Sequence, residues 1–287
     1  MPDATSIPRI TAAELIDRYA VLLLDAYGVL VHGRGALPGA AEFIERLNRI
    51  GKPYYILTND VAKLPATAAA HYGGYGLALS PERIISAGVL LKDYFAKHDL
   101  AGKRCVVLGP MDSARYVEMA GGKLVAAGED FEVLVVADES GFPFLDTVDK
   151  VLTALFAQVD RQGSISMILP NPDLIFPTAA SGFGFAAGSI ALLLEAALQL
   201  RYPDRGELRF ARLGKPHTAI FEAAQQRCGS RDMVMIGDQL QTDIRGANAY
   251  GIDSVLVTGG VSGAGFTLRR DGPQPTYIMD SLWLARC

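Results

Sequence analysis

Short apolar segments alternate with longer amphipathic segments along the chain. Seven short apolar runs predict buried β-strands, at residues 21–24, 54–57, 105–108, 133–137, 166–169, 233–236 and 254–257. Five segments predict helices, at residues 38–50, 146–158, 189–200, 217–227 and 242–250. Continuous apolar strands separated by helices are typical of a parallel sheet covered on both faces. We therefore predict the α/β fold class.

Length and composition add a domain organisation to this pattern. With 287 residues, half of them hydrophobic, the chain is long enough for a large domain that carries an inserted smaller one. The polar segment 198–210 contains Pro203 and Gly206 and predicts a boundary loop. We expect a core built from residues 1–85 and 208–287, with residues 86–207 inserted between them.

Charge and cysteine content exclude several partners. The net charge is −4 and no block of Lys and Arg is present, which argues against nucleic acid. The three cysteines form no CxxC pair, so neither a disulfide framework nor a zinc site is predicted, and a reducing cytoplasm fits best. The apolar stretch 182–200 contains glycine, serine and Glu195, which favours a buried helix over a membrane span. We expect no secretion signal and no membrane partner.

Polar clusters lie where a ligand is expected. In open α/β sheets, ligands bind beyond the carboxyl ends of the strands. Residues 25–29 (DAYGV) and 58–60 (TND) each follow a predicted strand, as does the segment 237–243 (GDQLQTD). A fourth cluster, residues 214–217 (GKPH), precedes a predicted helix. Each cluster alone is more often an ordinary turn, a helix cap or a solvated surface, and their combination carries the argument.

Together the clusters supply what phosphoryl transfer requires. The reaction needs a nucleophile, a divalent cation, hydrogen-bond donors for the phosphate oxygens and a positive side chain. Asp25 is placed to attack phosphorus and form an aspartyl-phosphate. Asp25 and Asp238 provide oxygen ligands of the kind that Mg²⁺ prefers. Thr58 and the backbone amide of Asn59 can bind a phosphate, and Lys215 supplies the positive charge.

The motifs DAYGV, TN, GKP and GDxxxTD resemble the four ordered motifs of the haloacid dehalogenase superfamily. The insertion, with Asn171-Pro172-Asp173 and the glycine-rich segment 181–189, is similar to the cap of class IIA, NagD-like phosphatases. The resemblance implies a Rossmann-like, doubly wound parallel sheet with an inserted α/β cap domain of the class IIA type. It implies these site residues: Asp25 as nucleophile and metal ligand, the Tyr27 carbonyl and Asp238 as metal ligands, Asp243 as metal-site support, Thr58 and Asn59 as phosphate binders, and Lys215 as charge stabiliser. Asn171 and Asp173 are candidate substrate contacts from the cap, although an Asx-Pro turn explains them nearly as well.

The chain departs from the phosphatase pattern at one catalytic position. Phosphatases that it resembles carry a second Asp two residues after the nucleophile, which protonates the leaving group and later activates water; here that residue is Tyr27. Loss of such a group removes roughly 10²- to 10⁴-fold in rate. Tyrosine at this place also resembles the haloacid dehalogenases proper. Asp60 is open to two interpretations, a displaced acid or a helix cap.

We therefore expect a Mg²⁺-dependent phosphatase that acts on a small phosphorylated metabolite through an aspartyl-phosphate. One alternative is a catalytically weakened phosphate-binding or regulatory protein. A dehalogenase is disfavoured, because attack on carbon does not require the metal ligands of residues 237–243. The identity of the substrate and a homo-oligomer formed through the cap are left open by the sequence.

Overall fold

The computed structural model describes residues 7–161, 165–177, 182–258 and 271–284. Its main feature is a parallel core sheet in the order β15-β14-β13-β1-β4-β5. The strands of this sheet are β1 (Val21–Leu24), β4 (Tyr54–Thr58), β5 (Ile84–Ser86), β13 (Met233–Gly237), β14 (Asp253–Val257) and β15 (Tyr277–Met279). Strand order reverses beside β1, as in a doubly wound sheet, so the predicted α/β class is confirmed.

Strand β1 is buried on both faces because its apolar side chains alternate between two helical layers. Leu22 and Leu24 join the apolar cluster with helices α1 (Ala12–Arg18), α2 (Ala40–Arg49) and α3 (Pro65–Gly73). Leu23 packs in the cluster on the opposite face, with helices α4 (Leu90–Lys97), α8 (Ala219–Cys228) and α9 (Arg245–Tyr250). Successive strand residues point to opposite faces, so a continuous apolar run can fill both layers.

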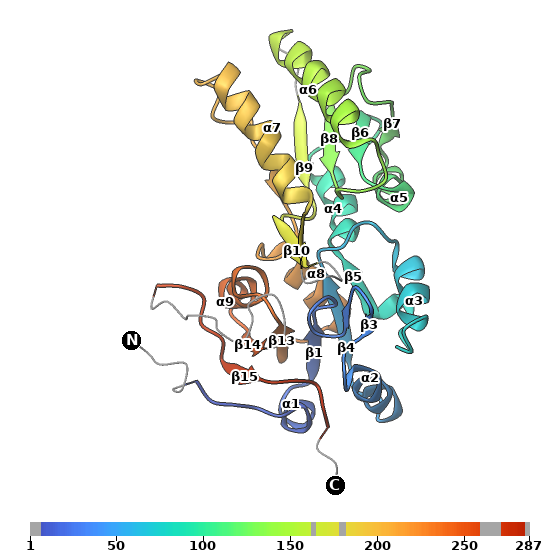
Figure 1. Ribbon diagram of the computed structural model, residues 1–287, viewed down its shortest axis with the longest axis vertical. Helices are drawn as coiled ribbons and strands as arrows, with labels where there is room; N and C mark the ends of the chain where they lie inside the picture. Colours follow the sequence, from blue (N-terminus) through green and yellow to red (C-terminus); the bar gives the residue numbers. More distant parts are fainter. Residues whose placement is uncertain (1–6, 162–164, 178–181, 259–270, 285–287) are drawn as a thin grey trace.

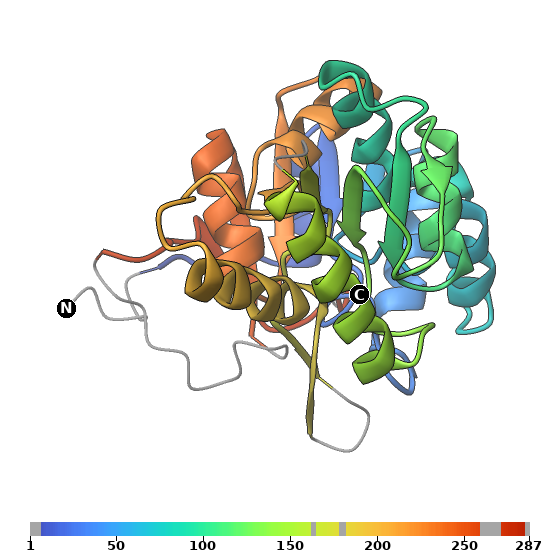
Figure 2. The same cartoon turned by 90° about the horizontal axis from the view of Figure 1, so that it is seen from above.

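A second parallel sheet, here called the cap sheet, lies beyond the core sheet along the long axis of the molecule (Figure 1). Its strand order is β12 (Ala211–Arg212), β9 (Ser166–Leu169), β8 (Val133–Val136), β6 (Arg104–Leu108) and β7 (Lys123–Leu124). Helices α6 (Phe144–Asp160) and α7 (Ala187–Arg201) lie side by side on one face (Figure 2). Helices α4 and α5 (Met111–Met119) cover the other face.

Short elements complete the fold. Two antiparallel pairs are formed by β2 (Val31–His32) with β3 (Gly35–Ala36) and by β10 (Ile175–Pro177) with β11 (Phe183–Phe185). Single helical turns occupy Pro81–Arg83, Ala87–Val89 and Leu240–Ile244, the last a π-helical turn that leads into α9. Within the described part of the chain, no helix combines the length and apolar character needed to cross a membrane.

The structure corrects the sequence-based boundaries in two places. Residues 198–201 of the expected boundary loop form the last turn of α7, which ends at Arg201. Strand β12 lies within residues 208–287, expected to belong to the core, but it pairs with β9 in the cap sheet. The division into a core and an inserted cap stays a proposal, and in it we move the return to the core from residue 208 to the residue after Arg212.

Candidate active site

The core sheet brings three of the predicted clusters together. Strands β13, β1 and β4 are neighbours and run in the same direction, so their carboxyl ends meet at one edge. Asp238 directly follows β13, Asp25 directly follows β1, and Thr58 is the last residue of β4. The backbone amide of Asp25 donates to the Ile236 carbonyl at 2.9 Å, which continues the ladder to the start of the loop.

Three buried carboxylates form a potential metal site. One oxygen from each of Asp25, Asp238 and Asp243 lies within 4.8 Å of the others. Gly28 packs against this cluster, because a Cβ atom at that position would lie 2.2 Å from Oδ2 of Asp238. Oxygen donors at this spacing suit a hard divalent cation such as Mg²⁺. The donor set and the close approach of the loop therefore fit the expected ion.

Lys215 lies among these carboxylates. Its ammonium nitrogen is 2.7 Å from Asp25 Oδ1 and 2.7 Å from Asp243 Oδ1, and the side chain is buried. Burial acts to lower the pKa of Lys215, but the charges of Asp243 and Asp25 outweigh it and raise the pKa above its usual value. The lysine is therefore a fixed cation at the nucleophile. Burial, supported by the charge of Asp243 and opposed by Lys215, raises the pKa of Asp25 to about 7.

The side chain of Asn59 holds Lys215 in place. Its amide oxygen accepts from the Lys215 backbone N–H at 2.8 Å, and its amide nitrogen donates to the Lys215 carbonyl at 3.0 Å. The same nitrogen donates to Asp173 Oδ1 at 3.0 Å. Gly214 allows this approach, since a Cβ there would lie 2.4 Å from the Asn59 oxygen. The Asn59 side chain is thus engaged with protein groups, and only its backbone is left for a phosphate.

A cavity of about 430 Å³ lies between the two sheets. The predicted residues that line it are Asp25, Tyr27, Thr58, Asn59, Asn171, Asp173 and Lys215, while Asp238 and Asp243 are fully buried. The Thr58 hydroxyl accepts from the Asp60 backbone N–H at 3.2 Å and keeps its own hydrogen to donate. Burial raises the pKa of Asp173 to about 6, against the opposing effects of Lys215 and Asn59. The structure therefore gathers every predicted site residue at one place.

Asp60 stabilises the turn that carries Lys63. Its two carboxylate oxygens accept from the Ala62 backbone N–H at 2.8 Å and from the Lys63 ammonium at 2.9 Å. Helix α3 begins later, with Leu64 at its N-cap, so Asp60 does not cap that helix. The helix-cap interpretation is therefore wrong, and the displaced acid stays a prediction. Burial and the charge of Asp60 raise the pKa of the neighbouring Tyr27 phenol, with Lys63 opposing.

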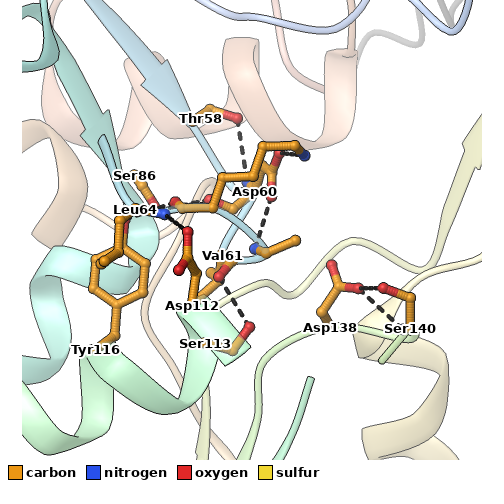
Figure 3. A network of polar contacts seen from close by, with 12 residues as sticks. Thr58, Asp60, Val61, Leu64, Ser86, Asp112, Ser113, Tyr116, Asp138 and Ser140 are labelled. Atoms are coloured by element: carbon orange, nitrogen blue, oxygen red, sulfur yellow. Dashed lines mark hydrogen bonds and ion pairs between the residues drawn. The ribbon is translucent and has the colours of Figure 1, made fainter. Parts of the chain in front are cut away.

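A further polar segment of the cavity wall was not predicted from the sequence. Asp138, Glu139 and Ser140 follow β8 in the cap sheet and line the cavity opposite the core. Asp138 Oδ1 accepts from the Ser140 backbone N–H at 3.0 Å and from its hydroxyl at 2.6 Å (Figure 3). The signal was available, because these residues follow an apolar run just as the predicted clusters do.

Helix α5 of the cap is hydrogen-bonded to the core segment that bears Lys63 (Figure 3). Asp112 accepts from the Leu64 backbone N–H at 2.9 Å, and the Ser113 hydroxyl donates to the Val61 carbonyl at 3.0 Å. The Tyr116 hydroxyl donates to the Lys63 carbonyl, also at 3.0 Å. These contacts fix one end of the cap against the core beside the cavity.

The chain belongs to the haloacid dehalogenase-like hydrolases. Family models of that description match residues 22–123 and 212–285, which carry the nucleophile loop and the Lys215 and Asp238 clusters. Dihydroxyacetone phosphatase of Corynebacterium glutamicum is 28% identical over 91% of this chain and 88% of its own length. Ribonucleotide monophosphatase NagD of Escherichia coli is 27% identical over 84% of this chain and 88% of its own length. The resemblance to NagD-like class IIA phosphatases is confirmed.

A solved structure agrees with this placement. The crystal structure of a possible sugar phosphatase of the same superfamily from Cytophaga hutchinsonii has a TM-score of 0.81 and is 29% identical. The match covers 98% of this chain and 100% of that chain, so it includes both sheets. The expected Rossmann-like core with a cap is therefore confirmed.

Proposed function

We propose that this protein is a Mg²⁺-dependent phosphatase that hydrolyses a small phosphorylated metabolite through an aspartyl-phosphate on Asp25. The observation that carries the proposal is the buried contact of Lys215 with both Asp25 and Asp243 in the wall of the cavity. Relatives named as phosphatases of small phosphorylated compounds support the same reaction class. They disfavour the dehalogenase and the purely regulatory alternatives.

In the proposed reaction, Asp25 attacks the phosphorus atom and the bond from phosphorus to the leaving oxygen breaks. The Lys215 ammonium offsets the negative charge of the phosphoryl group, while the Thr58 hydroxyl and backbone amides of the loop bind its oxygens. Water then attacks the aspartyl-phosphate, which releases phosphate and restores the Asp25 carboxylate. The cavity walls supplied by the cap exclude bulk water from this exchange.

The metal would be held by Asp25, Asp238 and the main-chain carbonyl of Tyr27, with Asp243 in support. When bound, it supplies Lewis-acid neutralisation of the phosphate charge. The presence of Tyr27 where the phosphatase pattern has Asp changes only the side chain, so the main-chain carbonyl remains available as a ligand. The proposed ligands therefore do not depend on the residue type at this position.

Asp25→Asn tests the proposal. It removes the nucleophile without changing the size of the side chain, and we expect phosphate release from every substrate to fall to background. The measurement is phosphate release from a panel of sugar, polyol and aryl phosphates, with Mg²⁺ and with EDTA. Asp17→Asn, which changes an exposed carboxylate on α1, is the matched control and should behave as wild type. Retained turnover in Asp25→Asn would remove the proposal.

A further inference from the structure

The proposed function does not yet assign a side chain to the role of general acid and base. An alkoxide leaving group needs a proton as its bond to phosphorus breaks, and the water of the second step must lose one. Tyr27 occupies the position of the usual acid, but burial and the charge of Asp60 raise the pKa of its phenol further above neutrality. Another group at the cavity must exchange this proton if alkyl phosphates are substrates.

Most carboxyl groups of the cavity are already engaged. Asp25 is the proposed nucleophile, and Asp60 accepts from Ala62 and Lys63. Asp138 accepts two hydrogen bonds from Ser140. Asp173 accepts from Asn59 and lies beside Lys215 in the phosphate-binding half of the site. Each of these groups is held as an acceptor by a neighbouring donor.

Glu139 differs from them. It lines the cavity from the cap side and is half-buried. Within the described residues its carboxyl group accepts a hydrogen bond from its own backbone amide and has no hydrogen bond or ion pair to another residue. The charged groups that face it are Asp138 beside it and Asp60 and Lys63 from the core. Its side chain is therefore close to the core segment that carries Asp60 and Lys63, and no other residue holds its carboxyl group as an acceptor.

The backbone holds Glu139 at a defined place. The amides of Ala137 and Asp138 both donate to the Leu108 carbonyl, at 2.9 and 3.1 Å. Gly141 has a φ of +86° and packs against Pro110, where a Cβ would lie 2.6 Å from the Pro110 Cα. The turn that presents Glu139 is thus anchored on both sides to the strand end and loop of β6, so the backbone position of Glu139 is set by the fold.

The ionisation of this group suits proton exchange near neutral pH. Burial, together with the negative charge of Asp138, raises the pKa of Glu139 to about 7. The proximity of Asp60 acts in the same direction, and Lys63 opposes it. A general acid and base is most effective when its pKa lies near the working pH.

We propose that Glu139 is the catalytic acid and base of this enzyme, an inference that rests on the proposed function. The cap would then supply the group that related phosphatases carry in the core, at the position of Tyr27. In-line displacement places the leaving oxygen and the attacking water in turn on the side of phosphorus opposite Asp25. Asp25 lines the cavity from the end of a core strand and Glu139 from the end of a cap strand, so the proposal assigns the carboxyl group to that side.

The two half-reactions balance with this one group. In the first, the Asp25 oxygen bonds to phosphorus, the bond to the leaving oxygen breaks, and the Glu139 proton passes to that oxygen, which leaves as the alcohol. In the second, the Glu139 carboxylate takes a proton from a water molecule while the oxygen of that water bonds to phosphorus. The bond to Asp25 then breaks, and inorganic phosphate leaves with Asp25 and Glu139 restored.

Glu139→Gln tests this assignment, because the amide preserves size but cannot release the proton. Wild type, Glu139→Gln and the control Glu118→Gln, an exposed cap residue, are compared on an alkyl phosphate and on 4-nitrophenyl phosphate at saturating Mg²⁺. We expect kcat for the alkyl phosphate to fall roughly 10²- to 10⁴-fold in Glu139→Gln. With the aryl phosphate, whose leaving group needs no proton, we expect a rapid burst of one nitrophenolate per site followed by slow turnover.

The other outcomes separate the two proposals. Alkyl phosphate turnover by Glu139→Gln within threefold of wild type would overturn the role of Glu139 alone. Equal losses on both substrates without a burst would also overturn it, since a residue that only shapes the cavity does not distinguish leaving groups. Wild-type protein that releases no phosphate from either substrate would overturn the proposed function itself. Thermal unfolding midpoints and Mg²⁺ titrations of all three proteins verify that fold and metal site are intact.

Discussion

At the scale of single residues, position 27 shows how a main-chain and a side-chain role can be separated. The proposed metal ligand is the Tyr27 carbonyl, which any residue provides. The phenol itself is partly buried near Asp60 and Lys63, and its raised pKa keeps it protonated at neutral pH. A group that holds its proton this firmly is a weak acid for catalysis. We therefore expect the side chain to contribute to the cavity wall rather than to proton transfer.

This separation of roles predicts the effect of the substitution Tyr27→Phe. It retains the carbonyl and the ring and removes only the hydroxyl, so we expect kcat and the Mg²⁺ concentration at half-maximal activity to change by less than about fivefold, well below the loss typical of a catalytic acid. Steady-state kinetics on the alkyl phosphate and 4-nitrophenyl phosphate would measure both quantities. A hundredfold loss confined to the alkyl substrate would instead give the proton-transfer role to Tyr27.

The site residues that could be predicted from the sequence are those in which a chemically suitable side chain stands at the end of a predicted strand. Asp25, Thr58 and Asp238 each stand at or just after the end of an apolar run, and the structure places them at one sheet edge. The clamp of Asn59 on the Lys215 backbone was not predictable, because the two residues are far apart in sequence. The segment that contains Glu139 follows an apolar run and could have been singled out from the sequence, but its relation to the core depends on how the cap is placed.

At the scale of elements, the turn after β1 is shaped by its approach to the buried carboxylates. Gly28 has a φ of +85° and lies where a Cβ would overlap the Asp238 carboxylate. Gly76 has a similar φ of +82°, but a Cβ there would meet nothing within 4 Å. Both glycines therefore require a positive φ, but only Gly28 lies against the Asp238 carboxylate. Gly76 is thus a matched control for substitutions at Gly28.

We expect Gly28→Ala and Gly76→Ala to lose stability by a similar conformational amount, about 1–2 kcal/mol, since alanine disfavours positive φ. Only Gly28→Ala should also displace the loop or the Asp238 carboxylate. We therefore expect it to raise the Mg²⁺ concentration at half-maximal phosphatase activity at least tenfold, with little change in Gly76→Ala. Denaturant unfolding and Mg²⁺ titration of activity measure the two effects. Identical titrations for the two variants would show that the contact with Asp238 does not shape the metal site.

The elements found by periodicity were those with a strong local signal. The strands buried on both faces, such as β1 and β13, read as continuous apolar runs and were located to within a residue. Helix α3 was missed because its sequence, PATAAAHYG, is rich in alanine and shows little contrast between its faces. Strands β5 and β15 are only three residues long and are stabilised by their neighbours in the sheet rather than by a local pattern.

At the scale of the whole molecule, the core and the cap meet through buried polar contacts at the cavity. The Asn59 amide donates to Asp173, so the cap turn after β9 is joined to the residue that clamps Lys215. Asp173 is partly buried, and desolvation raises its pKa to about 6 from an ordinary value of 3.8. Closing the cap on the core thus places a carboxyl group where its charged form is disfavoured, which couples the stability of the molecule to pH.

The direction of this coupling is set by the raised pKa. Between pH 3.8 and about 6, the folded protein keeps a proton on Asp173 that the unfolded chain releases. The contribution of this group to stability is therefore fully present below the unfolded pKa and is lost as the pH rises through about 6. A difference of about two between the folded and unfolded pKa corresponds to a loss on the order of 2–3 kcal/mol.

Asp173→Asn should remove this loss, because the amide cannot ionise and still offers an oxygen to the Asn59 nitrogen. We expect the free energy of unfolding of Asp173→Asn, relative to wild type, to increase by on the order of 2–3 kcal/mol as the pH rises from about 4 to about 7. Urea unfolding of both proteins at intervals across this range, with EDTA present, gives the difference and cancels the contributions of other titrating groups. Asp149→Asn, which alters an exposed carboxylate on α6, should run parallel to wild type. A curve for Asp173→Asn that also runs parallel to wild type would show that the carboxyl group titrates alike in the folded and unfolded states, and that closing the cap does not disfavour its charge.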